Sequence, residues 1–231
     1  KTFLILISIQ TFLFASQQII LVVSEDFNTS SASMECYEDG EKVFRTLHVN
    51  IGKNGLGWGF GEVNLTKKSG EPLKKEGDKK APAGVFKLTN IFGYEEKRNL
   101  HMPYLFASKN LICVDDAESG NYNQIIHMTE NKPKSFEYMK RDDGQYELGI
   151  VVAHNKSGVK QGGSCIFIHV EKFKNAPTVG CTSMTLEELK KITSWLDETK
   201  NPILIQIPKS SSKEILTLFP QLKASQLLNQ D

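Results

Sequence analysis

The residues best suited to chemistry lie in the last third of the sequence, where a histidine is followed by a cysteine. His169 ends the apolar run 166–169, and Cys181 lies in a glycine-containing turn just before a predicted helix at Thr185. A side chain at the end of a strand projects at the rim of a sheet, so these two side chains could meet. A neighbouring imidazole and the positive end of a helix dipole both favour a nucleophilic thiolate.

Gly180 precedes the cysteine and would let the backbone come close to a ligand, so the amides of Gly180 and Cys181 could hold an oxyanion. A structural interpretation stands beside this catalytic one. Isolated cysteines are usually small buried hydrophobic residues, and a histidine at a strand end is usually a surface or satisfied residue. Spacing alone therefore does not establish a catalytic pair.

Neither a metal nor a cofactor is expected. The chain has four cysteines, none in C-x-x-C spacing, and its five histidines form no H-x-x-x-H or H-E-x-x-H pattern. By strand alternation Cys165 shares a face with His169. It could line the catalytic side, form a disulfide with Cys36 or Cys113, or fill the core, and core filling is our default expectation.

Composition and charge describe an ordinary globular domain. Of 231 residues 39% are hydrophobic, and 28 basic side chains balance 27 acidic ones. Balanced charge argues against a protein that coats nucleic acid by neutralising phosphates, so no nucleic-acid partner is expected. A small or locally polar ligand fits better, and the sequence does not indicate an oligomeric state.

The N-terminal residues predict export. Lys1 is followed by the apolar run 2–14 and the small residues Ala15 and Ser16, an order typical of a secretory signal. We expect residues 1–16 to be this signal and residues 17–231 to form a single domain. There are two alternatives. The segment could remain as an uncleaved anchor, which would be the only contact with the membrane, or it could form a buried N-terminal helix or strand.

Hydrophobic patterns predict a mostly β fold with few helices, of the α+β class. The expected strands span residues 18–23, 43–51, 85–88, 111–114, 124–128, 147–154, 164–169 and 203–207. A long polar loop is expected over residues 52–84. The sequence Thr185-Leu-Glu-Glu188 has capping-box form and opens an apolar 3.6-residue pattern, which predicts a helix that ends before Asn201-Pro202. Residues 213–219 predict a short terminal helix.

The segment from His169 to Met184 resembles the signature of the L,D-transpeptidase (YkuD-type) catalytic domain, in which a strand histidine is followed by Ser/Thr-x-Gly-Cys. That motif here is Thr178-Val-Gly-Cys181. The resemblance covers about residues 19–207 and points to a periplasmic branch of the family. Further similar segments are Glu76-Gly-Asp78, Ala81–Phe86, Val114-Asp-Asp116, Tyr122-Asn123 and His154-Asn155.

This resemblance implies a β-sandwich or barrel-like fold, a location in the periplasm or cell envelope, and peptidoglycan stem peptides as substrate. Cys181 would be the nucleophile, His169 the base, and the amides around Gly180 the oxyanion donors. Attack would release terminal D-Ala and leave a thioester, which an amine resolves into a cross-link. We expect such transpeptidation, in cell wall biogenesis and the control of cell shape. The alternatives are an L,D-carboxypeptidase, in which water resolves the thioester, and a catalytically silent peptidoglycan-binding module.

The chain departs from the family pattern in two ways. Many members have His before the glycine and Arg or Asn two residues after the cysteine, whereas this chain has Val179 and Ser183, and the interval between His169 and Cys181 is short. Because a hydroxyl does not replace a bidentate guanidinium, another cation is expected to anchor a substrate carboxylate, either Arg141 or a lysine among residues 74–80.

Other polar residues are weaker candidates for substrate binding. The residues that we assign to this role are Thr178, Ser183, His154, Asn155 and Tyr122. For His154-Asn155 a structural hydrogen-bonding role is equally open. Asp115 and Asp116 could bind the amino end of a stem peptide, although adjacent acids at a strand end usually form turns.

Overall fold

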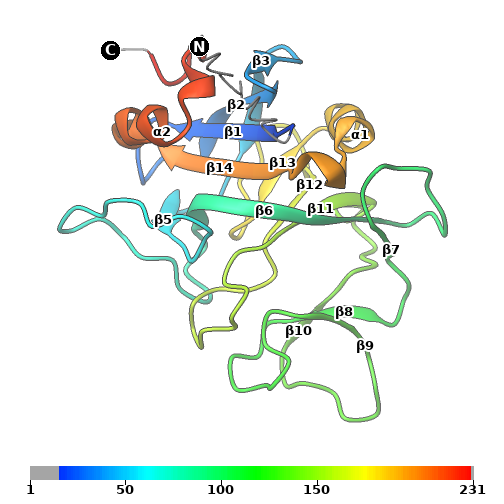
Figure 1. The fold of residues 1–231 in the computed structure, drawn as a ribbon. Helices are drawn as coiled ribbons and strands as arrows, with labels where there is room; N and C mark the ends of the chain where they lie inside the picture. The colour runs from blue at the N-terminus through cyan, green and yellow to red at the C-terminus, as the bar shows by residue number, and fades with distance from the viewer. Residues whose placement is uncertain (1–15, 230–231) are drawn as a thin grey trace, which may run out of the picture.

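The computed structural model describes residues 16–229, and its centre is a closed barrel of eight strands (Figure 1). Around the barrel the order is β1-β14-β6-β11-β12-β13-β4-β2, and β2 pairs again with β1. The pairs β1–β14 and β12–β13 are parallel and the other pairs are antiparallel. The barrel strands are β1 (Gln18–Ser24), β2 (Ser31–Glu38), β4 (Leu47–Asn50), β6 (Ala81–Gly93), β11 (Leu148–Val152), β12 (Phe167–Val170), β13 (Thr182–Met184) and β14 (Ile203–Pro208).

Burial explains the sequence of the central strands. Every residue of β1 and of β14 is buried, and both strands are rich in Ile, Leu and Val, as expected of strands covered on both faces. Three short strands extend the barrel sheet: β3 (Glu41–Lys42), β5 (Leu56–Trp58) and β7 (Tyr104–Phe106).

Two short α-helices lie at one end of the barrel, at the top of Figure 1: α1 (Leu186–Trp195) and α2 (Ser212–Leu218). Helix α1 contacts β11 and β12, with Leu189 and Ile192 in the core. Single 3₁₀ turns are η1 (Glu198–Lys200), η2 (Lys209–Ser211) and η3 (Pro220–Leu222). Among the described residues, no helix has the length and apolar content needed to cross a membrane.

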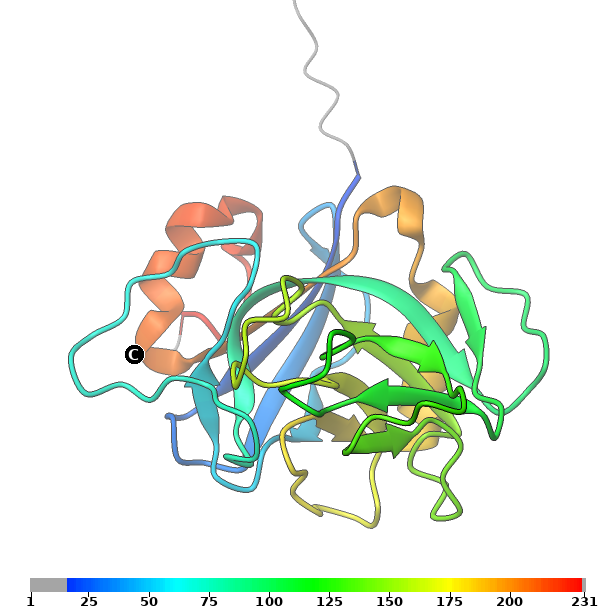
Figure 2. The same cartoon turned by 90° about the horizontal axis from the view of Figure 1, so that it is seen from below.

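A separate sheet of three antiparallel strands lies on the side of the barrel opposite to the helices (Figures 1 and 2). Its strands are β8 (Leu111–Val114), β9 (Ile125–His127) and β10 (Phe136–Tyr138). A second hydrophobic cluster joins this small sheet to the barrel, with Phe92 and Phe167 from the barrel packed against Leu111, Met139 and Tyr146. Cys181 belongs to this cluster, so the small sheet packs directly beside the candidate nucleophile.

The expected mostly β fold with few helices is confirmed, and so is the helix after Thr185, whose side chain accepts a hydrogen bond from Glu188 N as a capping box requires. Other boundaries differ. The expected strand over residues 43–51 is confined to β4, and the expected loop over residues 52–84 contains β5 and the start of β6. The signal predicted for residues 1–16 lies, apart from Ser16, outside the described residues.

Candidate active site

Cys181 lies at the end of a turn that leads into β13, with only 6% of its surface exposed. Its Sγ accepts a hydrogen bond from Phe167 N at 3.3 Å and lies 3.5 Å from Cys165 O. It lines a cavity of about 220 Å³ together with Lys74, Glu76, Gly77, Lys79, Asp115, Glu137, Ser164, Cys165, Ile166, Val179 and Gly180. A buried thiol that faces a small polar cavity is the arrangement expected of a nucleophile that meets its substrate there.

The surroundings of Cys181 keep it protonated at rest. Burial, and after it the negative charge of Glu137, raise the pKa of the Cys181 thiol to about 12. The Phe167 amide and the positive charges of Lys74 and Arg141 act in the opposite direction. At neutral pH the group is therefore a thiol, and its proton must be removed during the reaction.

His169 lies in β12, and burial lowers the pKa of its imidazole to about 4, so the ring is neutral at pH 7. Its Nδ1 lies 2.8 Å from Val170 O, and because a carbonyl only accepts hydrogen bonds, Nδ1 carries the proton. The lone pair is then on Nε2, which can act as a base. The Tyr146 ring packs edge-on against the imidazole, with ring centroids 5.3 Å apart.

The pairing of β12 and β13 relates the two candidate catalytic residues. These strands are parallel, with His169 opposite Ser183, and Cys181 comes two positions before Ser183. Side chains alternate along a strand and paired residues point to the same side, so all three side chains are on one face. Within the described residues Cys181 Sγ and His169 share no hydrogen bond, and His169 is not among the residues that line the cavity.

The turn before the nucleophile is fixed by Thr178. Its hydroxyl donates to Cys181 O at 2.6 Å and accepts from Gly180 N at 3.1 Å. Gly180 has φ +146°, and a Cβ there would lie 3.2 Å from Lys80 O, so glycine is needed both for the conformation and for the close approach. Thr178 thus shapes the turn, and the Gly180 amide expected to hold an oxyanion points at the Thr178 hydroxyl in this structure.

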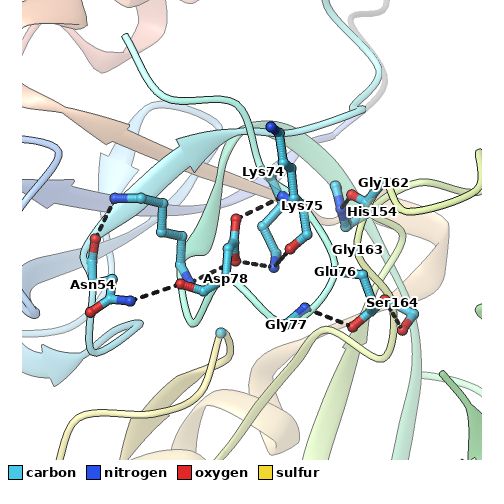
Figure 3. Close-up of polar contacts among 12 residues, drawn as sticks. Asn54, Lys74, Lys75, Glu76, Gly77, Asp78, His154, Gly162, Gly163 and Ser164 are labelled. Atoms are coloured by element: carbon cyan, nitrogen blue, oxygen red, sulfur yellow. Dashed lines mark hydrogen bonds and ion pairs between the residues drawn. The ribbon is translucent and has the colours of Figure 1, made fainter. Parts of the chain in front are cut away.

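The lysine-rich segment of residues 74–80, which lies in the expected polar loop, forms one wall of the cavity. Figure 3 shows the polar contacts of this segment. Lys74 is buried, and its Nζ donates to Lys75 O at 2.7 Å and to Asp78 Oδ1 at 2.6 Å. Asp78 also accepts hydrogen bonds from Lys75 N and Lys80 N. Arg141 is instead paired with Asp143 and stacked over Tyr146, and it is not among the cavity-lining residues.

Tyr122 is connected to the cavity through Glu76. Its hydroxyl donates to Glu76 Oε2 and accepts from Gly163 N, and Ser164 Oγ donates to the same carboxylate oxygen. Asp115 lines the cavity, whereas the carboxylate of Asp116 accepts backbone amides in a turn. Of these residues, Glu76 and Asp115 are the ones that present polar groups to a ligand.

His154 and Asn155 are buried outside the set of residues that line the nucleophile cavity. His154 accepts from Phe60 N and its Nε2 lies 3.0 Å from Gly162 O, while burial lowers its pKa to about 4. The Asn155 side chain binds backbone groups of Val159 and Gly163. Both residues organise the segment of residues 155–163 that leads to β12.

A disulfide joins Cys113 of β8 to Cys165, which precedes β12. The default expectation that Cys165 merely fills the core is therefore wrong, because its sulfur lies within bonding distance of the small sheet; pairing with Cys113 was one of the alternatives left open. Cys36 and Cys181 are free. Ser183 is buried, and its Oγ has no hydrogen-bond partner among the described residues.

Glu137 carries no signal in the sequence. Lys74 and Glu76 belong to the segment of residues 74–80, whereas Glu137 comes from β10, and only the folded chain brings these two segments together. In the folded chain Glu137 accepts a hydrogen bond from the Tyr146 hydroxyl, and burial raises the pKa of its carboxyl group. Among the described residues, no group of three His, Cys, Asp or Glu side chains is arranged to hold a metal ion.

Comparison with protein families finds a match that covers most of the chain. The family model described as YkuD, L,D-transpeptidase catalytic domain, matches residues 19–205. No curated protein matches the chain. No solved structure matches it either.

Proposed function

The chain belongs to the YkuD family of L,D-transpeptidase catalytic domains, and from this premise we propose that it is a cysteine-dependent peptidoglycan L,D-transpeptidase that acts on stem tetrapeptides. The family implies L,D-transpeptidase-type activity on peptidoglycan. The observation that carries the finer proposal is the position of Cys181, a free cysteine that lines a polar cavity on the strand face it shares with His169.

The proposed reaction begins from the neutral thiol and imidazole. When the peptide binds, the Cys181 proton moves to His169 Nε2 as Sγ attacks the carbonyl of the L-centre of the diaminoacid. Because Sγ contacts Cys165 O at rest, attack requires it to turn away from that oxygen. The imidazolium then gives its proton to the departing D-Ala amine, and a thioester remains on Cys181.

Charge stabilisation in this proposal comes from the turn before the nucleophile. The negative oxygen of the tetrahedral intermediate forms next to Gly180 and Cys181, whose amides are the expected donors. The Gly180 amide would have to exchange its contact with the Thr178 hydroxyl for one with the substrate.

An amine acceptor resolves the thioester into a cross-link between two diaminoacid residues, and water would resolve it into a tripeptide. The small sheet and the segment of residues 74–80 both border the cavity, which favours a bound acceptor over bulk water. Because the substrate lies outside the cytoplasmic membrane, we also propose a periplasmic or cell-envelope location, with residues 1–16 as the export signal and residues 17–231 as a single domain. A disulfide is typical of such a compartment.

The test uses defined tetrapeptide muropeptides and two matched variants. Cys181→Ala removes the proposed nucleophile, and Cys36→Ala removes the other free, buried cysteine, whose pKa is also raised to about 12. We expect Cys181→Ala to abolish dimer formation and Cys36→Ala to retain it, as read by mass spectrometry of the products. Tripeptide and D-Ala as sole products, even with excess acceptor, would replace transpeptidation by L,D-carboxypeptidase activity. Turnover by Cys181→Ala would contradict the assignment of the nucleophile.

A further inference from the structure

Lys74 is a buried cation in the wall of the nucleophile cavity. Its side chain is only 4% exposed, and two hydrogen bonds hold its Nζ, one to Lys75 O and one to Asp78 Oδ1 (Figure 3). An ammonium group has three protons to donate, so one donor remains for a ligand. Because Lys74 lines the cavity with Cys181, that ligand would be part of the substrate.

The position of Nζ is fixed by a turn rather than by a flexible surface side chain. Asp78 accepts hydrogen bonds from Lys75 N at 2.7 Å and from Lys80 N at 2.9 Å, and the same carboxylate holds the Lys74 ammonium. A charge held in this way binds an anion without the cost of ordering a long side chain. The pair is therefore preorganised for a carboxylate, the strongest small anionic acceptor in a peptide.

Lys74 lies close to the turn that carries the nucleophile. A Cβ at Gly180 would lie 3.9 Å from Lys74 Nζ, and Gly180 directly precedes Cys181 in the chain. In the donor peptide, the terminal carboxylate belongs to the residue that directly follows the carbonyl attacked by Sγ. A cation beside the turn is therefore close to where that carboxylate must lie.

The other charged groups of the cavity direct a carboxylate toward Lys74. Glu76 is engaged by the hydroxyls of Tyr122 and Ser164, while Asp115 and Glu137 come from the small sheet and would repel an anion. Lys79, the second cation, is exposed. Among the described residues that line this cavity, Lys74 is therefore the one buried cation that a substrate carboxylate can contact.

We propose that Lys74 is a specificity residue that binds the C-terminal carboxylate of the donor stem peptide, so that the enzyme selects peptides with a free terminal carboxylate. This inference rests on the proposed function. It also narrows to Lys74 the expectation from the sequence that Arg141 or a lysine among residues 74–80 anchors a substrate carboxylate.

The test compares one tetrapeptide stem as the free acid with the same peptide as its C-terminal amide. For the wild type we expect kcat/KM of thioester formation to be about 10- to 100-fold higher on the acid, the value of one charge-assisted hydrogen bond. Lys74→Met should lower kcat/KM on the acid by that factor and leave the amide nearly unchanged. Lys75→Met, which removes an adjacent exposed lysine, should leave both values at the wild-type level.

The outcomes separate this inference from the proposed function. Equal losses on acid and amide in Lys74→Met would overturn carboxylate binding, because a structural or oxyanion role affects both substrates alike. Equal kcat/KM of the wild type on the acid and on the amide would also overturn carboxylate binding. This comparison needs no variant, so it remains decisive if Lys74→Met does not fold. A wild type that reacts with neither peptide contradicts the proposed function itself.

Discussion

At the scale of single residues, burial determines the chemistry of the proposed pair. The pKa of Cys181 is raised to about 12 and that of His169 is lowered to about 4, so neither residue is charged at neutral pH. If Cys181 and His169 were a thiolate and an imidazolium at rest, no proton would have to move during the attack. Here the proton must move as the sulfur attacks, which makes the protonation state of His169 the pH-dependent element.

The pH dependence of acylation follows from that state. His169 must be neutral to accept a proton, and its pKa is below the usual value of about 6.5, so activity should persist as pH falls from 7 to about 5 and be lost near pH 4. The measurement is the rate of thioester formation against pH in the wild type. An acidic limb centred near pH 6.5 would show that His169 is not the buried neutral base described here.

Gly180→Ala tests the turn before the nucleophile. A side chain at φ +146° is strained, and its Cβ would lie 3.2 Å from the backbone oxygen of Lys80. We expect a loss of about 1–3 kcal/mol in the free energy of unfolding and a larger loss of acylation rate, because Cys181 and its amide shift with the turn. Urea unfolding and acylation kinetics measure the two effects. Acylation at the wild-type rate in this variant would contradict the claim that the turn positions Cys181.

At the scale of elements, the capped helix α1 packs against β11 and β12. The Thr185 hydroxyl accepts a hydrogen bond from Glu188 N and donates one to Glu188 Oε2. It thereby pairs a backbone amide of the first turn that has no partner within the helix. Thr185→Ala should lower the free energy of unfolding by about 1 kcal/mol and leave acylation unchanged, because the cap does not line the cavity. Glu187→Ala, which removes an exposed acid of the same turn without a capping bond, is the control. Equal effects of both substitutions would contradict the capping assignment.

The predictable elements are those whose signal is local. Helix α1 has a capping box and a 3.6-residue apolar repeat, and β1 and β14 are rich in Ile, Leu and Val, so their own residues suffice to predict them. Strand β2 contains Ser31, Ser33 and Glu35, and only its pairing with β1 and β4 makes it a strand. Local sequence does not report such long-range pairing.

The candidate site divides in the same way. His169, Gly180 and Cys181 are within one short stretch of sequence, and their types indicate the chemistry. Lys74 and Glu137 line the same cavity although they are 63 residues apart in sequence. The burial that raises the pKa of Cys181 likewise depends on packing against the small sheet, which belongs to another part of the chain.

At the scale of the whole molecule, the Cys113–Cys165 disulfide fastens the small sheet to the barrel beside the nucleophile. It closes a sequence separation of 52 residues, and Cys165 O is the atom that Cys181 Sγ contacts. A link across a loop of this length typically stabilises a protein by about 2–4 kcal/mol. The bond thus contributes both to overall stability and to the geometry around Cys181.

Reduction should reveal both contributions. We expect a reductant to lower the Tm of the wild type and to slow acylation, because the small sheet loses its covalent attachment. The double variant Cys113→Ala/Cys165→Ala should resemble the reduced wild type and respond no further to reductant. An unchanged Tm on reduction of the wild type would mean that packing of the second hydrophobic cluster alone holds the sheet in place.

The most direct test of a cysteine-dependent L,D-transpeptidase is the intact mass of the protein after mixing with a tetrapeptide muropeptide. The account predicts an adduct equal to the donor minus D-Ala, located on Cys181 by peptide mapping, which decays to dimers when an acceptor stem is added. Cys181→Ala should form no adduct, whereas Cys36→Ala should form it as the wild type does. Turnover without any adduct, or an adduct on a residue other than Cys181, would contradict the account.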